Sequence, residues 1–249
     1  MRLLLLTGIQ EELLPLIPEF RLGFHSVGVY QSGSYPDFFA ATTGPGVKKG
    51  RQILELLKEI VPDVIVNAGL TGMLLDQSDK PGSPQPGDLL KISSIVDAQN
   101  DVIFPLGPHG KTLVTVKQPV FEPYQKAALA REHRAQFCDM EGARLIQLLR
   151  NAEDLRDETP IVFCKVVGDL PDHFDLYEHE HLVRSWDRKG FLGRMLVGFK
   201  FPGGPLRMRK LLQLKEAAIE GLTAHTTRTV KALLGGADPD TLGSVYAPA

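Results

Sequence analysis

Short apolar runs alternate with amphipathic segments along most of this chain. Residues 2–7 and 63–68 are apolar runs, and each of them ends at a glycine, Gly8 or Gly69. Runs of this length that stop at a turn residue are typical of buried strands. Between them, residues 48–60 place apolar side chains at helical spacing, which predicts an amphipathic helix.

The same alternation continues downstream. Further strands are expected at 25–31, 37–42, 88–96, 111–117 and 160–167, and further helices at 122–134, 140–150 and 205–234. Residues 74–87 are rich in Asp, Ser, Pro and Gly and are expected to form a loop, and the last dozen residues a loose tail. Because strands and helices alternate with no interdomain linker, residues 1–249 are predicted to form a single α/β domain.

Composition narrows the function class. The 28 basic and 30 acidic residues leave a net charge of −2, which argues against a nucleic-acid partner. Two cysteines cannot build a disulfide framework and favour a reducing compartment. The first apolar run is too short for a signal peptide, and no run approaches the ~20 apolar residues of a membrane helix. We therefore expect a cytoplasmic protein that binds no membrane.

Polar and glycine residues follow three of the predicted strands. The first strand leads into Gly8–Glu12, the strand at 63–68 into Gly69–Gly72, and the strand at 160–167 into Gly168-Asp169. A fourth segment, Asp139–Gly142, opens a helix. Ligands of open α/β sheets collect at the carboxyl ends of strands. Taken singly, however, a glutamate in a first helical turn is more often a favourable dipole contact, and Asp169 also suits a helix N-cap.

In this order, the segments resemble the purine nucleoside phosphorylase and nucleosidase superfamily, and most closely the nucleosidases that act on methylthioadenosine and S-adenosylhomocysteine. The resemblance covers roughly residues 1–175. The matching segments are Thr7–Glu12, Thr43–Lys48, Asn67–Gly72, Pro86–Leu90, Asp139–Ala143 and Lys165–Asp169. The resemblance implies a central mixed β-sheet flanked by helices, a small-molecule nucleoside substrate, no cofactor and a homodimer.

The resemblance also implies roles for three carboxyl groups. Asp169 would protonate the departing base, which otherwise leaves as an unfavourable anion. Glu12 would orient and deprotonate the attacking water, with Glu11 as the alternative if the loop shifts by one residue. Glu141 would accept two hydrogen bonds from the ribose 2′,3′-diol.

The remaining candidate binding residues surround the sugar and the base. Met140 would lie under the sugar, Thr71 and Gly72 would belong to the turn on the sugar side, and Phe121 would stack on the base. Met140 and Phe121 are equally consistent with ordinary core packing. Lys165 stands where the family has arginine. Because a buried lysine needs a partner, a carboxylate such as Glu12 is expected beside it, and a snorkelling residue at a sheet edge is the alternative.

Residues 173–204 are interpreted as an insertion, and the helix after them, about 205–234, as the long terminal helix of the family. His173, His179 and His181 lie among acidic residues in this insertion, but an exposed polar loop rarely binds metal, so no metal site is assigned. The aromatic residues of the segment favour a lid over the 5′ substituent of the substrate.

Hydrolysis is favoured over phosphorolysis. Phosphate sites ordinarily use arginine forks. The family's phosphorylases carry an arginine at the position of Asn67 and another soon after the first strand, where this chain has none between Arg2 and Arg21. Lys48 and Lys49 keep phosphorolysis open as the first alternative. A nucleoside-binding protein without catalysis is the second.

A dimer interface is expected near residues 102–104. Val102, Ile103 and Phe104 form an apolar cluster after the polar stretch 97–101, in the place where the family's dimer interface lies.

Overall fold

A computed structural model describes residues 1–75, 83–120, 122–152, 155, 159–169, 194, 197, 200 and 203–246. Phe121 and most of the predicted lid at 173–204, with its three histidines, lie outside the described residues. The expectations placed on them therefore remain predictions.

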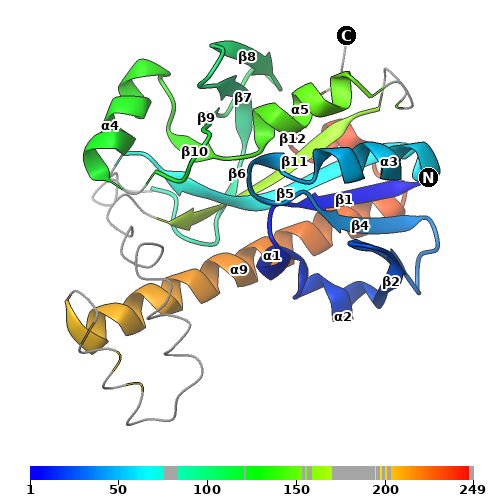
Figure 1. Cartoon of the computed structure of the whole chain (residues 1–249), viewed down its shortest axis with the longest axis horizontal. Coiled ribbons are helices and arrows are strands. Elements are labelled where there is room, and N and C mark those ends of the chain that lie inside the picture. Colours follow the sequence, from blue (N-terminus) through cyan, green and yellow to red (C-terminus); the bar gives the residue numbers. More distant parts are fainter. Residues whose placement is uncertain are drawn as a thin grey trace.

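All described strands belong to one mixed sheet of twelve strands (Figure 1). Its main path runs β2-β3-β4-β1-β5-β10-β9-β7-β8. These strands are β1 (Leu3–Thr7), β2 (Leu22–Ser26), β3 (Val29–Ser32), β4 (Phe38–Thr42), β5 (Val64–Met73), β7 (Ile92–Asp97), β8 (Val102–Pro105), β9 (Lys111–Thr115) and β10 (Phe137–Asp139). Three other strands lie off this path. Strand β11 (Ile161–Asp169) pairs with β5, and both β6 (Leu89–Leu90) and β12 (Ser244–Tyr246) pair with β11.

The central strands β4, β1, β5 and β11 run parallel, so their carboxyl ends share one edge of the sheet. Alternation along β1 turns Leu4 and Leu6 towards one face, and Leu3 and Leu5 towards the other. Both faces are covered, which explains why β1 reads as a continuous apolar run.

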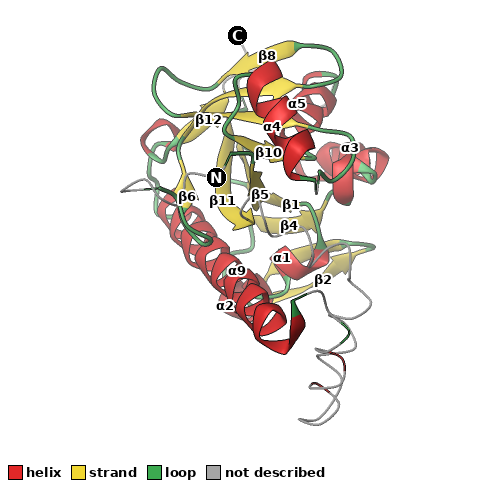
Figure 2. Ribbon diagram, turned by 90° about the vertical axis from the view of Figure 1, so that its left-hand side faces the viewer, coloured by secondary structure: helices red, strands yellow, loops and turns green. Residues whose placement is uncertain are grey.

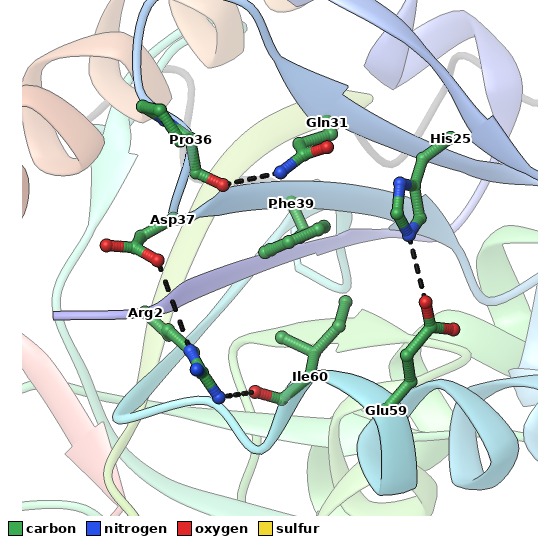
Figure 3. Close-up of a pocket in the computed structure, with 8 residues that line it drawn as sticks. All are labelled: Arg2, His25, Gln31, Pro36, Asp37, Phe39, Glu59 and Ile60. Carbon is green, nitrogen blue, oxygen red and sulfur yellow. Dashed lines mark hydrogen bonds and ion pairs between the residues drawn. The ribbon is translucent and has the colours of Figure 1, made fainter.

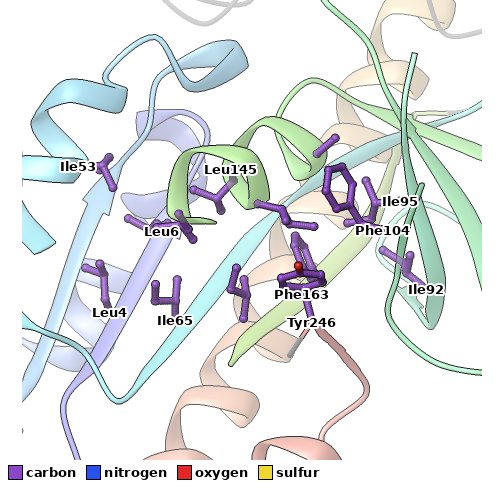
Figure 4. Close-up of a cluster of buried hydrophobic side chains, with 14 of the residues drawn as sticks. Leu4, Leu6, Ile53, Ile65, Ile92, Ile95, Phe104, Leu145, Phe163 and Tyr246 are labelled. Carbon is purple, nitrogen blue, oxygen red and sulfur yellow. The ribbon is translucent and has the colours of Figure 1, made fainter. Parts of the chain in front are cut away.

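Helices cover the two faces of the sheet separately (Figure 2). The helices are α1 (Gln10–Leu13), α2 (Leu16–Phe20), α3 (Gly50–Ile60), α4 (Pro123–Glu132), α5 (Gly142–Arg150) and α9 (Gly204–Leu234). Apolar residues of α3 and α5 pack on the Leu4 face, with Leu145, Phe163 and Tyr246 in the same cluster (Figure 4). Residues of α1, α2 and α9 pack on the Leu3 face. Among the described residues, no helix is both long and apolar enough to span a membrane.

Most predicted elements are confirmed to within a few residues, and the exceptions are informative. The predicted strand 25–31 is wrong, because a turn at Gly28, where φ is 75°, separates β2 from β3. The predicted strand 88–96 divides into β6 and β7, which pair with different neighbours. The prediction of a loose tail over the last dozen residues is also wrong, since β12 pairs antiparallel with β11.

Candidate active site

Glu12 is the first carboxylate at the carboxyl edge of the sheet. Helix α1 begins three residues after β1 ends, and Glu12 turns back over that strand end. Its Oε2 accepts hydrogen bonds from the backbone N–H groups of Gly8 and Ile9, at 2.9 and 3.2 Å. Its Oε1 accepts another from Leu70 N–H on β5, at 2.9 Å. Glu12 is buried while Glu11 is exposed.

Glu141, Lys165 and Asp139 form an ionic cluster beside Glu12. Lys165 is fully buried on β11, and its Nζ lies 3.0 Å from Asp139 Oδ2 and 3.9 Å from Glu141 Oε2. The nearest partner of Lys165 is therefore Asp139 rather than the expected Glu12. Asp139 also accepts hydrogen bonds from Thr115 Oγ1 and from Gly142 N–H, which fixes it at the start of α5.

Two glycines leave room for this cluster. A Cβ at Gly69 would lie 3.2 Å from Lys165 Nζ, 3.4 Å from Glu12 Oε1 and 3.7 Å from Glu141 Oε2. These three charged groups therefore converge on one point of β5. A Cβ at Gly8 would collide with Glu141 Oε1. Glycine at both positions lets the carboxylates approach the backbone closely.

Burial controls the protonation of this cluster. Loss of solvation raises the pKa of Glu141 to about 8, even though the Lys165 ammonium lowers it. Burial also raises the pKa of Glu12, against the backbone hydrogen bond from Leu70 and the charge of Lys165. The pKa of Lys165 is itself raised: burial lowers it, but the carboxylates of Asp139 and Glu141 outweigh that effect. The cluster can thus hold or release a proton near neutral pH.

A second pair of charged side chains, Asp169 and Lys126, lies beside a later position of β5. Asp169 ends β11, and its Oδ2 lies 2.7 Å from the Nζ of Lys126, a residue of α4 that is only 1% exposed. The Asp169 Oδ1 lies 2.8 Å from the position of a Cβ at Gly72, and Cys138 Sγ lies 3.2 Å from the same point. Burial raises the pKa of the Cys138 thiol to about 12, so it remains neutral.

The Glu12 cluster and the Asp169–Lys126 pair lie at two points along β5. Gly69 marks the Glu12 cluster and Gly72 marks Asp169, which is three residues or about 10 Å along a strand. The structure therefore brings Glu12, Glu141 and Lys165 together, and places Asp169 and Gly72 together at a second point.

Other predicted binding residues have more ordinary surroundings. Met140 is half-buried. Thr71 is buried, and its hydroxyl donates to the carbonyl of Val166 at 3.2 Å, so it is already engaged by the backbone. Asn67 is fully buried and donates to the carbonyl of Leu6.

Two cations near the glycine turn at 43–48, Lys49 and Arg144, have protein partners. Gly44 and Gly46 both have positive φ, of 70° and 64°, which this tight turn requires. Lys49 Nζ donates to Thr42 Oγ1 at 2.8 Å. Arg144 on α5 donates to the carbonyl of Gly46 and to Gln99 Oε1. The Arg144 contact holds the turn against α5.

No role was assigned from the sequence to two charged residues of the site, Asp139 and Lys126. Asp139 could have been found, since it follows the apolar Phe137 and Cys138 and precedes Glu141 by two residues. Lys126 carried no such signal, because it lies in a polar helical segment where a lysine usually faces solvent.

A separate hollow of about 340 Å³ lies at the opposite edge of the sheet (Figure 3). Arg2 and Asp37 line it where β1 and β4 begin, and His25 faces Glu59 across it at 3.1 Å. Its polar groups already pair with each other, since Arg2 also donates to the carbonyl of Ile60. Nowhere in the described ranges do three or more His, Cys, Asp or Glu side chains form a metal-binding cluster.

The chain was compared with protein families, curated proteins and solved structures. No protein-family model matches the sequence, and a search of curated proteins found no match either. Solved structures do match. Methylthioadenosine nucleosidase of Arabidopsis thaliana superposes with a TM-score of 0.59 at 17% identity, covering 96% of this chain and 97% of that one. Methylthioadenosine/S-adenosylhomocysteine nucleosidase of Helicobacter pylori, in complex with a nucleoside analogue, gives a TM-score of 0.59 at 12% identity, over 92% and 97% of the chains.

A third match acts on a different nucleoside. Futalosine hydrolase of Helicobacter pylori superposes with a TM-score of 0.56 at 13% identity, over 86% of this chain and 97% of that one. The predicted fold class is thus confirmed, and the chain has the same fold as these nucleosidases.

Proposed function

We propose that this protein hydrolyses the N-glycosidic bond of a purine-type nucleoside, such as methylthioadenosine, S-adenosylhomocysteine, futalosine or a related modified nucleoside. The observation that carries the proposal is the placement of Glu12, Glu141 and Asp169 at two points along the carboxyl end of β5. Structural neighbours with this fold include two kinds of nucleosidase, which supports the same reaction class.

The Glu12 cluster is suited to the sugar. Cleavage of a glycosidic bond passes through a cation-like sugar, which nearby carboxylates stabilise. Glu141 would accept hydrogen bonds from the 2′ and 3′ hydroxyls. Lys165 would keep Asp139 in place through its ion pair, and its Nζ lies 3.9 Å from Glu141 Oε2. Glu12, fixed by three backbone hydrogen bonds, would orient the attacking water and accept its proton.

Asp169 is suited to the base. The departing purine gains the electron pair of the broken bond and needs a proton at a ring nitrogen. Asp169 lies beside Gly72, three residues along β5 from Gly69. In the proposed complex the base contacts Asp169 while the ribose contacts Glu141. In this arrangement Asp169 would deliver the proton, which requires no metal and no cofactor.

Water is the favoured nucleophile. A phosphate-using enzyme needs cations free to bind the anion. Of the basic residues near the glycine turn, Lys49 and Arg144 already contact protein groups, and position 67 carries asparagine. This supports hydrolysis over phosphorolysis.

We also propose that the active protein is a homodimer joined through β8, one of the two end strands of the sheet path. Val102 and Ile103 are 40% and 63% exposed there, whereas Phe104 is buried in its own chain. Phe104 is therefore a core residue and not part of the proposed interface, contrary to the expectation from sequence.

Neighbouring glutamates offer a matched test of the reaction. Glu12→Gln removes the proposed base, and we expect it to slow release of purine by about 10²–10⁴-fold. Glu11→Gln changes an exposed neighbour of the same kind and should leave the rate within about 2-fold. Equal rates for the two variants would contradict the role given to Glu12.

The sugar contact has its own test. Glu141→Gln should weaken binding and turnover of a ribonucleoside more than of its 2′-deoxy analogue, which lacks one hydroxyl partner. Equal losses on both substrates would mean that Glu141 serves only the start of α5.

A further inference from the structure

Lys126 is a buried cation that the proposed reaction, as described so far, does not use. It is one of two buried residues of α4, and its neighbours on that helix are mostly exposed. Burying an ammonium costs several kcal/mol unless a partner compensates. Its partner is the Asp169 carboxylate, at 2.7 Å. The fold therefore buries a cation, at a cost in solvation free energy, beside the one carboxyl group proposed to act as an acid.

This pairing changes how Asp169 could obtain its proton. A lysine ammonium ordinarily keeps its proton far above the pH at which an aspartic acid has lost its own. A contact of 2.7 Å between the two groups therefore favours an ion pair in the free protein, with the proton on Lys126. An ionised Asp169 cannot protonate a base unless something supplies the proton.

We propose that Lys126 supplies this proton through Asp169, and so serves as a positioning residue that reloads the acid in each turnover. The inference rests on the hydrolysis proposed above. It deepens that proposal by assigning the source of the proton.

A bound base would trigger the transfer. An apolar purine over the pair excludes water, and loss of solvation penalises both charges. The neutral pair of amine and carboxylic acid then becomes accessible. Asp169 has 17% of its side chain exposed and Lys126 1%, so the carboxyl group is the member of the pair that a ligand can reach.

The proton balance closes in four steps. A proton moves from Lys126 Nζ to Asp169 Oδ2, which leaves a neutral amine and a carboxylic acid. The acid protonates a ring nitrogen of the base as the C1′–N bond breaks and its electron pair moves onto the base. Water forms the new bond to C1′ and gives a proton to Glu12. Solvent then takes that proton from Glu12 and returns one to Lys126.

Cys138 of β10 lies beside the pair, since its Sγ and the Asp169 Oδ1 both approach the Cβ position of Gly72. The Cys138 thiol is neutral, since burial raises its pKa to about 12. Asp139 is paired with Lys165, at 3.0 Å, in the other cluster.

The test compares Lys126→Met with the wild type across pH 5 to 9. Without Lys126, Asp169 must take its proton from solvent. We expect the loss in kcat/KM on a purine nucleoside to reach about 10²–10⁴-fold at pH 8 and to shrink towards pH 5. A nitrophenyl riboside needs little proton assistance, so its hydrolysis should stay within a few-fold at every pH. A loss that is equal on both substrates, or independent of pH, would overturn the inference.

Lys126→Arg separates supply of a proton from supply of charge. A guanidinium keeps the ion pair but does not release its proton in proteins. We expect this variant to lose purine hydrolysis and to keep nitrophenyl riboside hydrolysis, which also reports that it folds. Recovery of purine hydrolysis by arginine would overturn the inference. Lys231→Met, which removes a surface ion pair with Glu19, is the control and should match the wild type.

Asp169→Asn separates this inference from the proposed function. If Asp169→Asn loses purine hydrolysis while Lys126→Met keeps the wild-type pH profile, supply of the proton by Lys126 is refuted. The proposed hydrolysis then stands. If the wild type releases base from no nucleoside, both are refuted.

Discussion

Gly8 is the residue at which a single methyl group would disturb the proposed sugar site. The Cβ of an alanine there would collide with Glu141 Oε1, the movable end of a side chain. Gly8 has no unusual φ, so alanine adds no backbone strain. We expect Gly8→Ala to change the free energy of unfolding by less than about 1 kcal/mol. Turnover should fall much further, because the Glu141 carboxylate must move.

Steady-state kinetics and thermal unfolding of the same preparation check this. A loss of stability with unchanged kcat/KM would show that the Glu141 carboxylate is not needed at that position.

Protonation of Glu141 should make stability depend on pH. Burial raises its pKa from 4.5 to about 8, so the folded state binds this proton more tightly than the unfolded state. The stability it contributes is complete below pH 4.5 and is lost as pH rises through 8. Glu141→Gln stays neutral, so its Tm should match the wild type near pH 4.5 and exceed it increasingly up to pH 8.

For a chain of this size, each kcal/mol of difference in free energy of unfolding shifts Tm by about 2–4 °C. Glu11→Gln controls for the loss of one negative charge. A Tm difference that stays constant with pH would show that Glu141 is ionised in the folded protein at all pH values tested.

The sequence indicated where the proposed site residues lie better than it indicated which groups they pair with. Glu12, Glu141 and Asp169 follow strands or open a helix, and chain order alone puts them at one edge of the sheet. Pairing depends on which face of which strand meets another element. Lys165 therefore finds Asp139 instead of Glu12, and Lys126 reaches Asp169 from a helix that shows no apolar stripe.

At the scale of elements, β12 joins the end of the chain to the core. Tyr246 is 2% exposed, and its ring centroid lies 6.3 Å from that of Phe104 and 5.0 Å from the Arg150 guanidinium (Figure 4). We expect Tyr246→Ala to cost about 3–5 kcal/mol in free energy of unfolding. Denaturant titration measures it.

Tyr246→Phe is the matched control. The Tyr246 hydroxyl is buried with no hydrogen-bond partner in the described part of the chain, so its removal should be neutral or stabilising. An alanine variant as stable as the wild type would mean that β12 does not hold the core.

Element prediction failed where elements are short. A three-residue strand such as β10 or β12 has no room for a periodic pattern, and its pairing is decided by distant segments. Long elements such as α3 and α9 were predicted closely, because each repeats its apolar positions over several turns.

For the whole molecule, the proposed dimer would cover an exposed edge strand. An unpaired edge with apolar side chains invites association. We expect a dimer at micromolar concentration, and we expect Ile103→Lys to convert it to a monomer. Phe24→Lys is the matched control, since Phe24 is 74% exposed on β2 at the other end of the sheet path.

Light scattering of the three proteins measures the assembly. A monomeric wild type would refute the dimer, and a dimer that survives Ile103→Lys would move the interface away from β8.

The most direct measurement is release of free base from a nucleoside panel, incubated with and without phosphate and followed by chromatography. The panel includes methylthioadenosine, S-adenosylhomocysteine and futalosine. We predict free base and free sugar from at least one member, at the same rate in phosphate-free buffer. Sugar 1-phosphate, or release that depends on phosphate, would contradict hydrolysis. Absence of base from every nucleoside would leave a binding protein with the fold of these enzymes.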